Sequence, residues 1–249
     1  MPDLDLVETL EKRLVNAWPS IETLALDRWL LRFARGYSKR ANSASAMSPN
    51  ATLDPDAIHH AASLFRAQHI RPVFRLTPLA ANEADTILAD AGFVLYDESL
   101  CLTAPLQLGQ GRHDPRVTIA PRASADWIMA AAASYGGDKA DHAALSEIVS
   151  RIRPSAAFAT LSHDGTDLAW GLAVAERGYV GLFDIVVAPR ARGEGLGRAM
   201  VTSLMAWGHG EGAHSAYLQV RDSNAIAQSL YRSLGFTQAY VYNHRVAID

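Results

Sequence analysis

Apolar residues recur along this chain with two different periods, and the two periods predict its helices and strands. Where they return every three to four positions the pattern predicts a helix, and where they alternate or run continuously it predicts a strand. The helices predicted in this way cover 5–17, 54–68, 81–91, 124–134, 141–152, 193–208 and 224–234. The strands cover 22–34, 72–76, 93–106, 117–119, 156–162, 167–176, 180–187, 216–221 and 236–248, which together predict a mixed α/β fold.

One stretch organises the second half of the chain. Residues 180–187 are apolar except at Gly181 and Asp184, as expected of a central strand in a sheet covered on both faces. Pro189 cannot donate to a strand partner and predicts the end of that strand. Three glycines then alternate with other residues, and three arginines precede or follow them in the sequence. The glycines are Gly193, Gly195 and Gly197, and the arginines are Arg190, Arg192 and Arg198.

A glycine-rich helix start of this kind favours an anion. The first backbone N–H groups of a helix lack partners, and the helix dipole adds about half a positive charge there. Glycines let a phosphate approach those groups, and arginines supply forked donors that match phosphate oxygens. We therefore expect a phosphate or pyrophosphate at residues 193–198; the alternative is a tight turn whose arginines are only solvated.

The stretch also resembles a known family. Arg192-x-x-Gly195-x-Gly197 is similar to the acetyl-CoA pyrophosphate loop of the GNAT acetyltransferases, Gln/Arg-x-x-Gly-x-Gly/Ala. A second GNAT segment, Asn-x-x-Ala-x-x-x-Tyr-x-x-x-Gly-Phe, follows in the right order and is matched at Asn224, Ala227, Tyr231, Gly235 and Phe236. The resemblance extends from about Arg116 to the C-terminus. It implies the GNAT fold and a direct transfer of the acetyl group of acetyl-CoA to an amine.

The N-terminal half repeats the strand–helix–Gly-Phe unit at 70–76 and 91–93 but has no Arg-x-x-Gly-x-Gly. We therefore expect two tandem copies of the fold. Residues 1–110 would form a degenerate GNAT-like domain and 111–249 the catalytic domain, joined by a linker at 107–115. The expected substrate is a primary amine of a small molecule. The alternatives are a protein lysine or N-terminal amine, and a sensor that binds acetyl-CoA without catalysis.

The resemblance assigns roles to individual residues. It implies that Tyr231 is the general acid that protonates the leaving thiolate, although a tyrosine there can also be a core aromatic. Asp184, the only ionisable residue in its strand, is either the general base or structural, because the family's base often lies nearer Gly181. The expected cofactor contacts are Val187, Arg190, Arg192, Gly193, Gly195, Leu196, Gly197, Arg198 and Asn224, and the expected amine contacts are Tyr135, Asp138 and Tyr242.

Composition excludes several other classes. The chain has 249 residues and a net charge of −3, which gives no basis for binding nucleic acid or an anionic membrane. Its single cysteine, Cys101, rules out an intramolecular disulfide, and its nine histidines show no metal-ligand spacing. With no signal peptide and no apolar run of membrane-spanning length, we expect a cytoplasmic protein. The sequence determines neither the particular amine nor the oligomeric state.

Overall fold

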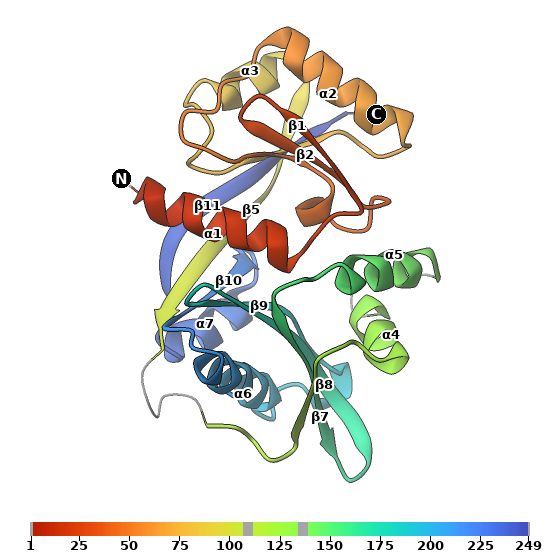
Figure 1. Cartoon of the computed structure of the whole chain (residues 1–249), viewed down its shortest axis with the longest axis vertical. Helices are drawn as coiled ribbons and strands as arrows, with labels where there is room; N and C mark the ends of the chain where they lie inside the picture. The colour runs from red at the N-terminus through yellow and green to blue at the C-terminus, as the bar shows by residue number, and fades with distance from the viewer. Residues whose placement is uncertain (1, 107–111, 134–138, 249) are drawn as a thin grey trace. The chain divides into compact units, whose positions relative to one another are not determined.

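A computed structural model describes residues 2–106, 112–133 and 139–248 of the chain (Figure 1). By their internal contacts the residues fall into two compact units. Unit 1 comprises 1–101, 220–224 and 238–249, and unit 2 comprises 102–219 and 225–237. The predicted mixture of helices and strands is confirmed. A domain boundary at residue 110 would assign 220–224 and 238–249 to the second domain, although their contacts place them in unit 1. The division into two domains, the first of them degenerate, therefore stays a prediction.

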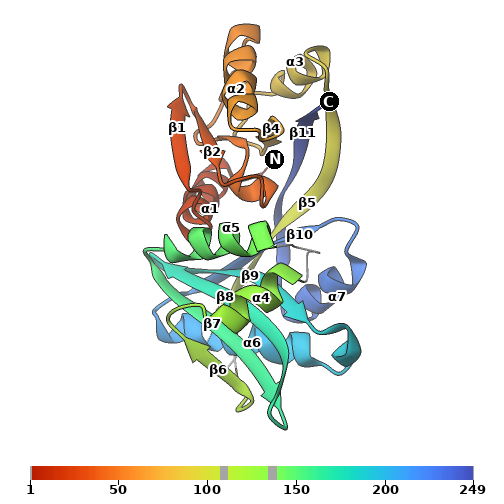
Figure 2. The same cartoon turned by 90° about the vertical axis from the view of Figure 1, so that its right-hand side faces the viewer.

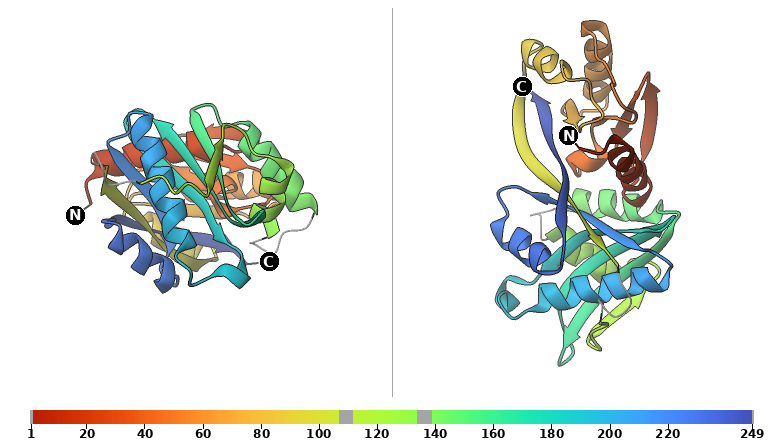
Figure 3. Two further views of the ribbon diagram at one scale, coloured as in Figure 1. Left: turned by 90° about the horizontal axis from the view of Figure 1, so that it is seen from below. Right: turned by 90° about the vertical axis from the view of Figure 1, so that its left-hand side faces the viewer.

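Unit 1 is a sheet with strand order β1-β2-β3-β4-β11-β5 and helices packed against it. Strands β3 and β4 are parallel, and the pairs β1–β2, β2–β3 and β4–β11 are antiparallel. The two longest strands, β5 and β11, lie side by side (Figure 3). The elements are α1 (Leu4–Ala17), β1 (Glu22–Leu26), β2 (Trp29–Phe33), η1 (Lys39–Ala41), β3 (Ala44–Ala46), α2 (Pro55–Ala67), β4 (Val73–Leu76), α3 (Ala84–Asp90), β5 (Phe93–Pro105) and β11 (Thr237–Ala247).

Two expectations for unit 1 were wrong in detail. Residues 22–34 form a hairpin rather than one strand, because Asp27 takes a left-handed backbone with φ of 50° and reverses the chain. Residues 44–46, which belong to none of the predicted elements, form the short strand β3 between β2 and β4. Three residues are too few to give a recognisable alternation, so this strand depends on its neighbours for its existence.

A buried polar network ties α1 to the sheet of unit 1. Glu11 of α1 accepts from both terminal nitrogens of Arg75, one of them at 3.0 Å, and from the hydroxyl of Tyr240. The guanidinium of Arg75 lies 3.9 Å from the centroid of the Tyr242 ring. All four side chains are buried. The carboxylate is therefore compensated inside the unit, as a buried charge requires.

The start of α2 offers a test of local stability. Asp54 accepts a hydrogen bond from the N–H of Ala57 at 2.7 Å, and Pro55 occupies the first turn of the helix. We expect Asp54→Ala to lower the free energy of unfolding by about 1 kcal/mol, measured by urea denaturation. Asp54→Asn keeps an acceptor and should stay within a few tenths of a kcal/mol of the wild type. Equal losses in the two variants would contradict a capping role.

Unit 2 has the strand order β10-β9-β8-β7-β6, with the end of β5 beside β10. Strand β10 is parallel to β9, and the remaining pairs in this series are antiparallel. The elements are β6 (Val117–Ala120), α4 (Ala125–Ala133), α5 (Lys139–Ser150), β7 (Ser155–His163), β8 (Thr166–Glu176), β9 (Tyr179–Val187), η2 (Pro189–Ala191), α6 (Leu196–Gly210), β10 (Ser215–Arg221) and α7 (Ala225–Ser233).

Helices cover both faces of this sheet (Figure 2). On one face Met200 and Leu204 of α6 lie within 3.1 Å of where a Cβ on Gly171 would stand, so a larger residue at that position on β8 would have to displace them. On the other face Trp127 of α4 packs edge-to-face on Phe158 of β7, with ring centroids 5.1 Å apart. The strand β9 therefore runs through a covered sheet, as its apolar sequence predicted.

Candidate active site

A β-bulge on β9 surrounds Asp184. Phe183 pairs with Leu172 and Val186 with Trp170, so Asp184 and Ile185 together face the single residue Gly171 of β8. Asp184 takes a left-handed backbone with φ of 46° and has 7% of its surface exposed. Bulges of this kind redirect side chains and concentrate near active sites. A buried carboxylate in this strained conformation is a candidate functional group.

Beyond that point β9 and β10 stop pairing. Their parallel register runs from Tyr179↔Ser215 to Leu182↔Leu218, whereas β9 continues to Val187 and β10 to Arg221. On its other side Val187 still pairs with Ala169 of β8. The edge of β9 that leads to Val187 can therefore offer main-chain groups to a ligand, as expected for the pantetheine arm.

The glycine loop turns directly from β9 into α6. Gly193 and Gly195 have φ of 84° and 79°, a left-handed conformation that disfavours side chains, and Leu196 is the first helical residue. The helix therefore starts three residues later than predicted. Its first hydrogen bond runs from the N–H of Ala199 to the carbonyl of Gly195, at 3.1 Å. The N–H groups of Leu196, Gly197 and Arg198 precede that bond and can bind a phosphate.

The two left-handed glycines leave open space beside the loop. A Cβ on Gly193 or Gly195 would meet no atom within 4 Å. Arg190 and Arg192 are exposed beside the loop, and the Nε of Arg192 donates to the carbonyl of Val187 at 3.4 Å. Arg198 instead donates to Ser233 of α7 at 2.6 Å and ties the first turn of α6 to that helix. The loop thus combines open space, helix N–H groups and two exposed guanidiniums, which suits a pyrophosphate.

Tyr231 lies on α7, the helix that Arg198 holds. Its ring packs edge-to-face on Phe236 with centroids 5.8 Å apart, and 8% of its surface is exposed. The helix ends at Ser233, Gly235 follows with φ of 88°, and the N–H of Phe236 donates back to the carbonyl of Tyr231. Burial raises the pKa of Tyr231 to about 12, so its phenol stays protonated at neutral pH and has a proton to donate.

The other predicted residues lie in different settings. Asn224 is exposed in the turn just before α7, where its N–H donates to the carbonyl of Arg221 at 3.0 Å. Tyr242 is buried in unit 1, where its ring lies over Arg75. It belongs to unit 1, whereas the glycine loop and Tyr231 belong to unit 2. Tyr135 and Asp138 lie outside the described residues.

Sequence reasoning missed Tyr217. The parallel register sets it opposite Gly181, and a Cβ on Gly181 would stand 2.6 Å from the Tyr217 hydroxyl oxygen. The ring also packs edge-to-face on Phe183 at 6.1 Å, and Tyr217 is 2% exposed. The family often has its base near position 181. In this chain a side chain at 181 would overlap Tyr217, so it is excluded while Tyr217 keeps this position. Only the register between β9 and β10 reveals this, and the sequence does not state that register.

Neither a metal centre nor a membrane segment is found in the part of the chain that the structure describes. Over 2–106, 112–133 and 139–248, no group of three or more His, Cys, Asp or Glu side chains could hold a metal ion. Within the same ranges, no helix is both long enough and apolar enough to cross a bilayer.

Comparisons with known proteins point to acetyl transfer. Residues 6–246 match the family described as "Probable histone acetyltransferase Rv0428c C-terminal". The chain is 28% identical over 250 residues to "Uncharacterized N-acetyltransferase YobR" of Bacillus subtilis (strain 168), covering 98% of this chain and 99% of that protein. It is 26% identical over 244 residues to "Probable histone acetyltransferase Rv0428c" of Mycobacterium tuberculosis (strain ATCC 25618 / H37Rv), covering 92% and 70%.

A solved structure shares the fold. The GCN5-related N-acetyltransferase from Kribbella flavida superposes with a TM-score of 0.70 at 18% identity, covering 100% of this chain and 97% of that one. The fold implied by the two sequence motifs is thereby confirmed.

Proposed function

Because the chain belongs to the Rv0428c C-terminal acetyltransferase family and is a GNAT N-acetyltransferase, we propose that it acetylates a primary amine of a small molecule from acetyl-CoA. The observation that carries this proposal is the start of α6. There three helix N–H groups follow two left-handed glycines whose surroundings are open, with two exposed arginines beside them. Bound acetyl-CoA would supply the acetyl thioester that the amine attacks.

In this proposal the loop holds the pyrophosphate and the end of β9 holds the arm that leads to the thioester. The N–H groups of 196–198 bind phosphate oxygens, with Arg190 and Arg192 beside them. Val187 and Asn224 offer hydrogen-bonding groups to the pantetheine. None of these contacts needs a change in the loop, because the helix start is already formed.

Asp184 acts as the general base in this proposal. An alkylamine has a pKa of about 10.4 and is charged at neutral pH, so a proton must leave before the nitrogen can attack. Asp184 removes it directly or through a water chain. The bulge holds this carboxylate in a fixed position on the covered part of β9.

Tyr231 acts at the other end of the reaction, on the departing sulfur. A thiol has an ordinary pKa of about 8.5, whereas burial raises the pKa of Tyr231 to about 12. The thiolate is thus a weaker base than the tyrosinate. Tyr231 therefore stabilises the thiolate mainly as a hydrogen-bond donor. A hydrogen bond to a charged group contributes about 1.5–3 kcal/mol, or roughly 10- to 150-fold in rate.

A turnover assay tests the substrate class. Free-thiol release should be measured with acetyl-CoA and panels of amino acids, polyamines and drug-like amines, beside lysine-containing peptides and proteins with free N-termini. We expect kcat/KM for the best small amine to exceed that for any peptide by about 10-fold or more, a difference of about 1.4 kcal/mol. The reverse order would support the second candidate, a protein amine. The matched family and the Mycobacterium tuberculosis relative are both described as probable histone acetyltransferases, which favours that candidate.

The same preparation distinguishes an enzyme from a sensor. CoA binding without thiol release from any amine would support the non-catalytic alternative. We also expect one CoA per chain at saturation, because the N-terminal half has no Arg-x-x-Gly-x-Gly. Calorimetry that found two equivalents would contradict the interpretation of a degenerate first copy.

A further inference from the structure

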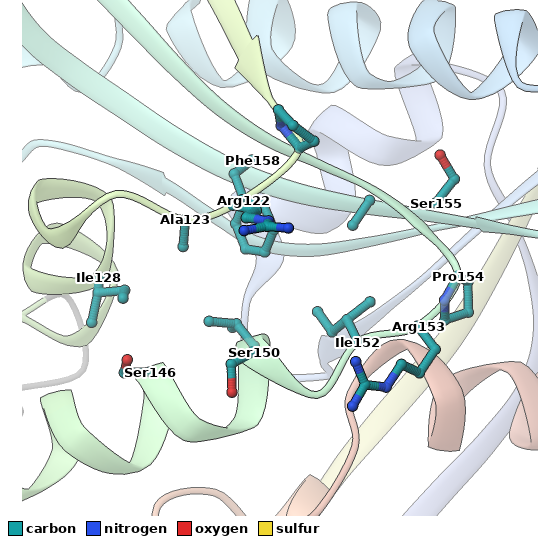
Figure 4. A pocket seen from close by; sticks show the side chains of 13 residues that line it. Arg122, Ala123, Ile128, Ser146, Ser150, Ile152, Arg153, Pro154, Ser155 and Phe158 are labelled. Atoms are coloured by element: carbon teal, nitrogen blue, oxygen red, sulfur yellow. The ribbon is translucent and has the colours of Figure 1, made fainter.

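A second pocket of unit 2 lies away from the glycine loop. It has a volume of about 550 Å³ and opens between the end of β6, the start of α4, the end of α5 and the start of β7 (Figure 4). This volume is within the range of sites that bind small molecules, roughly 300–1,000 Å³. Phe158, Val149 and Ile152 give it apolar walls, and the remaining lining includes Ser146, Ser150 and two arginines.

The sheet register separates this pocket from the cofactor loop. Ser155 of β7 pairs with Ala175 of β8, which in turn pairs with Val180 of β9. In the same way Leu161 of β7 is aligned with Val187 of β9 through Ala169. β7 and β9 run in the same direction because both are antiparallel to β8. The six residue-to-residue steps from Ser155 to Leu161 span about 20 Å along the strand, and two strand spacings add about 10 Å across the sheet.

The pocket carries uncompensated positive charge. Arg122, just after β6, and Arg153, just before β7, line it from different walls and are both exposed (Figure 4). Neither guanidinium makes an ion pair among the residues that the structure describes, and no acidic residue belongs to the described lining.

Two carboxylates adjoin the lining. Glu147 of α5 is paired with Arg151 at 2.8 Å, so this ion pair is neutral overall. Glu211 accepts from the hydroxyl of Ser155 at 2.6 Å and keeps its negative charge at that end of the pocket. Arg122 and Arg153 are the charged side chains of the described lining itself, which is therefore cationic.

We propose that this pocket binds a small organic anion, a carboxylate or phosphate monoester with an apolar body, as a ligand separate from CoA. Arginine matches carboxylate and phosphate oxygens with two parallel donors. The phenyl ring of Phe158 and the branched side chains of Val149 and Ile152 offer the apolar part a dry surface. An inorganic ion would satisfy the arginines but leave this apolar wall without a partner.

Calorimetry on the full chain with benzoate and with phenyl phosphate tests the proposal. At about 0.15 M salt, where exposed charges are screened, we expect each to bind with Kd of about 1 mM or tighter. Benzamide lacks the charge and inorganic phosphate lacks the apolar body, so both should bind at least about 10-fold more weakly. The ratio of benzoate to phenyl phosphate affinity tells which anionic group the site prefers.

Substitutions locate the site. Arg122→Gln and Arg153→Gln should each weaken benzoate binding about 10-fold, and the double variant should abolish it. Arg116→Gln is the matched control, since Arg116 is exposed at the far end of β6 and paired with Asp114 at 2.8 Å; it should bind benzoate as the wild type does. Saturating CoA should leave the benzoate affinity unchanged, given the separation along the sheet.

Three results would overturn the proposal. The first is that neither benzoate nor phenyl phosphate binds the wild type. The second is that both arginine variants bind as the wild type does while melting at its temperature. The third is that CoA displaces benzoate, which would make the pocket part of the cofactor site.

Discussion

Replacing Gly195 by valine is expected to weaken CoA binding by about 100-fold or more, because the new side chain occupies the space where the pyrophosphate must lie. Gly195 immediately precedes α6, and a Cβ added there meets no protein atom within 4 Å. In the proposed function the pyrophosphate occupies that space and accepts from the first N–H groups of the helix. Losing one or two hydrogen bonds to a charged phosphate costs about 1.5–3 kcal/mol each, which corresponds to the expected change in affinity.

The control for this substitution stands at the other end of the same helix. Gly212 has φ of 83°, close to the 79° of Gly195, and its added Cβ also meets nothing within 4 Å. A left-handed backbone costs a non-glycine residue about 1–2 kcal/mol, so both valine variants should lose similar melting temperature.

Calorimetry with CoA then separates strain from ligand binding. Gly212→Val should bind CoA as the wild type does, and Gly195→Val should not. If the two variants bind CoA equally well, the pyrophosphate does not lie at this helix start.

Local sequence patterns were sufficient to predict most of the elements. Asp164-Gly165 marked the turn between β7 and β8, and the structure has φ of 49° and 72° at these two residues. The turn at Asp27 has no glycine, so the hairpin of β1 and β2 was predicted as one strand. The start of α6 was placed at Gly193 because a glycine run does not reveal which of its members are left-handed.

The residues of the site also fall into those that the sequence predicts and those that only the structure reveals. The glycine loop and Tyr231 belong to motifs that are contiguous in sequence, so their residues could be named in advance. The bulge at Asp184 and the packing of Tyr217 against Gly181 depend on how β9 pairs with its neighbours, and the pocket that brings Arg122 and Arg153 together depends on how β6 pairs with β7. These pairings join residues that are far apart in the sequence, and a shift of one residue in β9 or β10 would turn the side chains of that strand to the opposite face.

Tyr231→Phe is expected to lower kcat about 100-fold with little change in the affinity for CoA. The variant removes one hydroxyl and keeps the ring that packs on Phe236, so the fold should be preserved. A lost donor to a developing thiolate affects the transition state and not the bound ground state, which is why kcat and not KM should fall. Because the pKa of Tyr231 is raised to about 12, the wild-type rate should show no decline from phenol ionisation up to about pH 10.

Asp184→Asn tests the other end of the reaction. Asparagine tolerates the left-handed backbone at this bulge, so the substitution removes the basicity of the side chain while keeping its shape. The rate should fall most at low pH, where the amine is charged, and recover as pH approaches the amine pKa of about 10.4. A purely structural Asp184 would give a lower melting temperature and no recovery.

Steady-state kinetics of both variants from about pH 6 to 10, with melting temperatures measured beside them, separates these roles. Near-wild-type kcat in Tyr231→Phe would rule out the donor assignment, whatever Asp184 does. A loss in Asp184→Asn that is independent of pH, at an unchanged melting temperature, would place Asp184 in the site but not as the base. The proposed mechanism requires the remaining combination: a pH-independent loss in the tyrosine variant and a loss rescued by alkali in the aspartate variant.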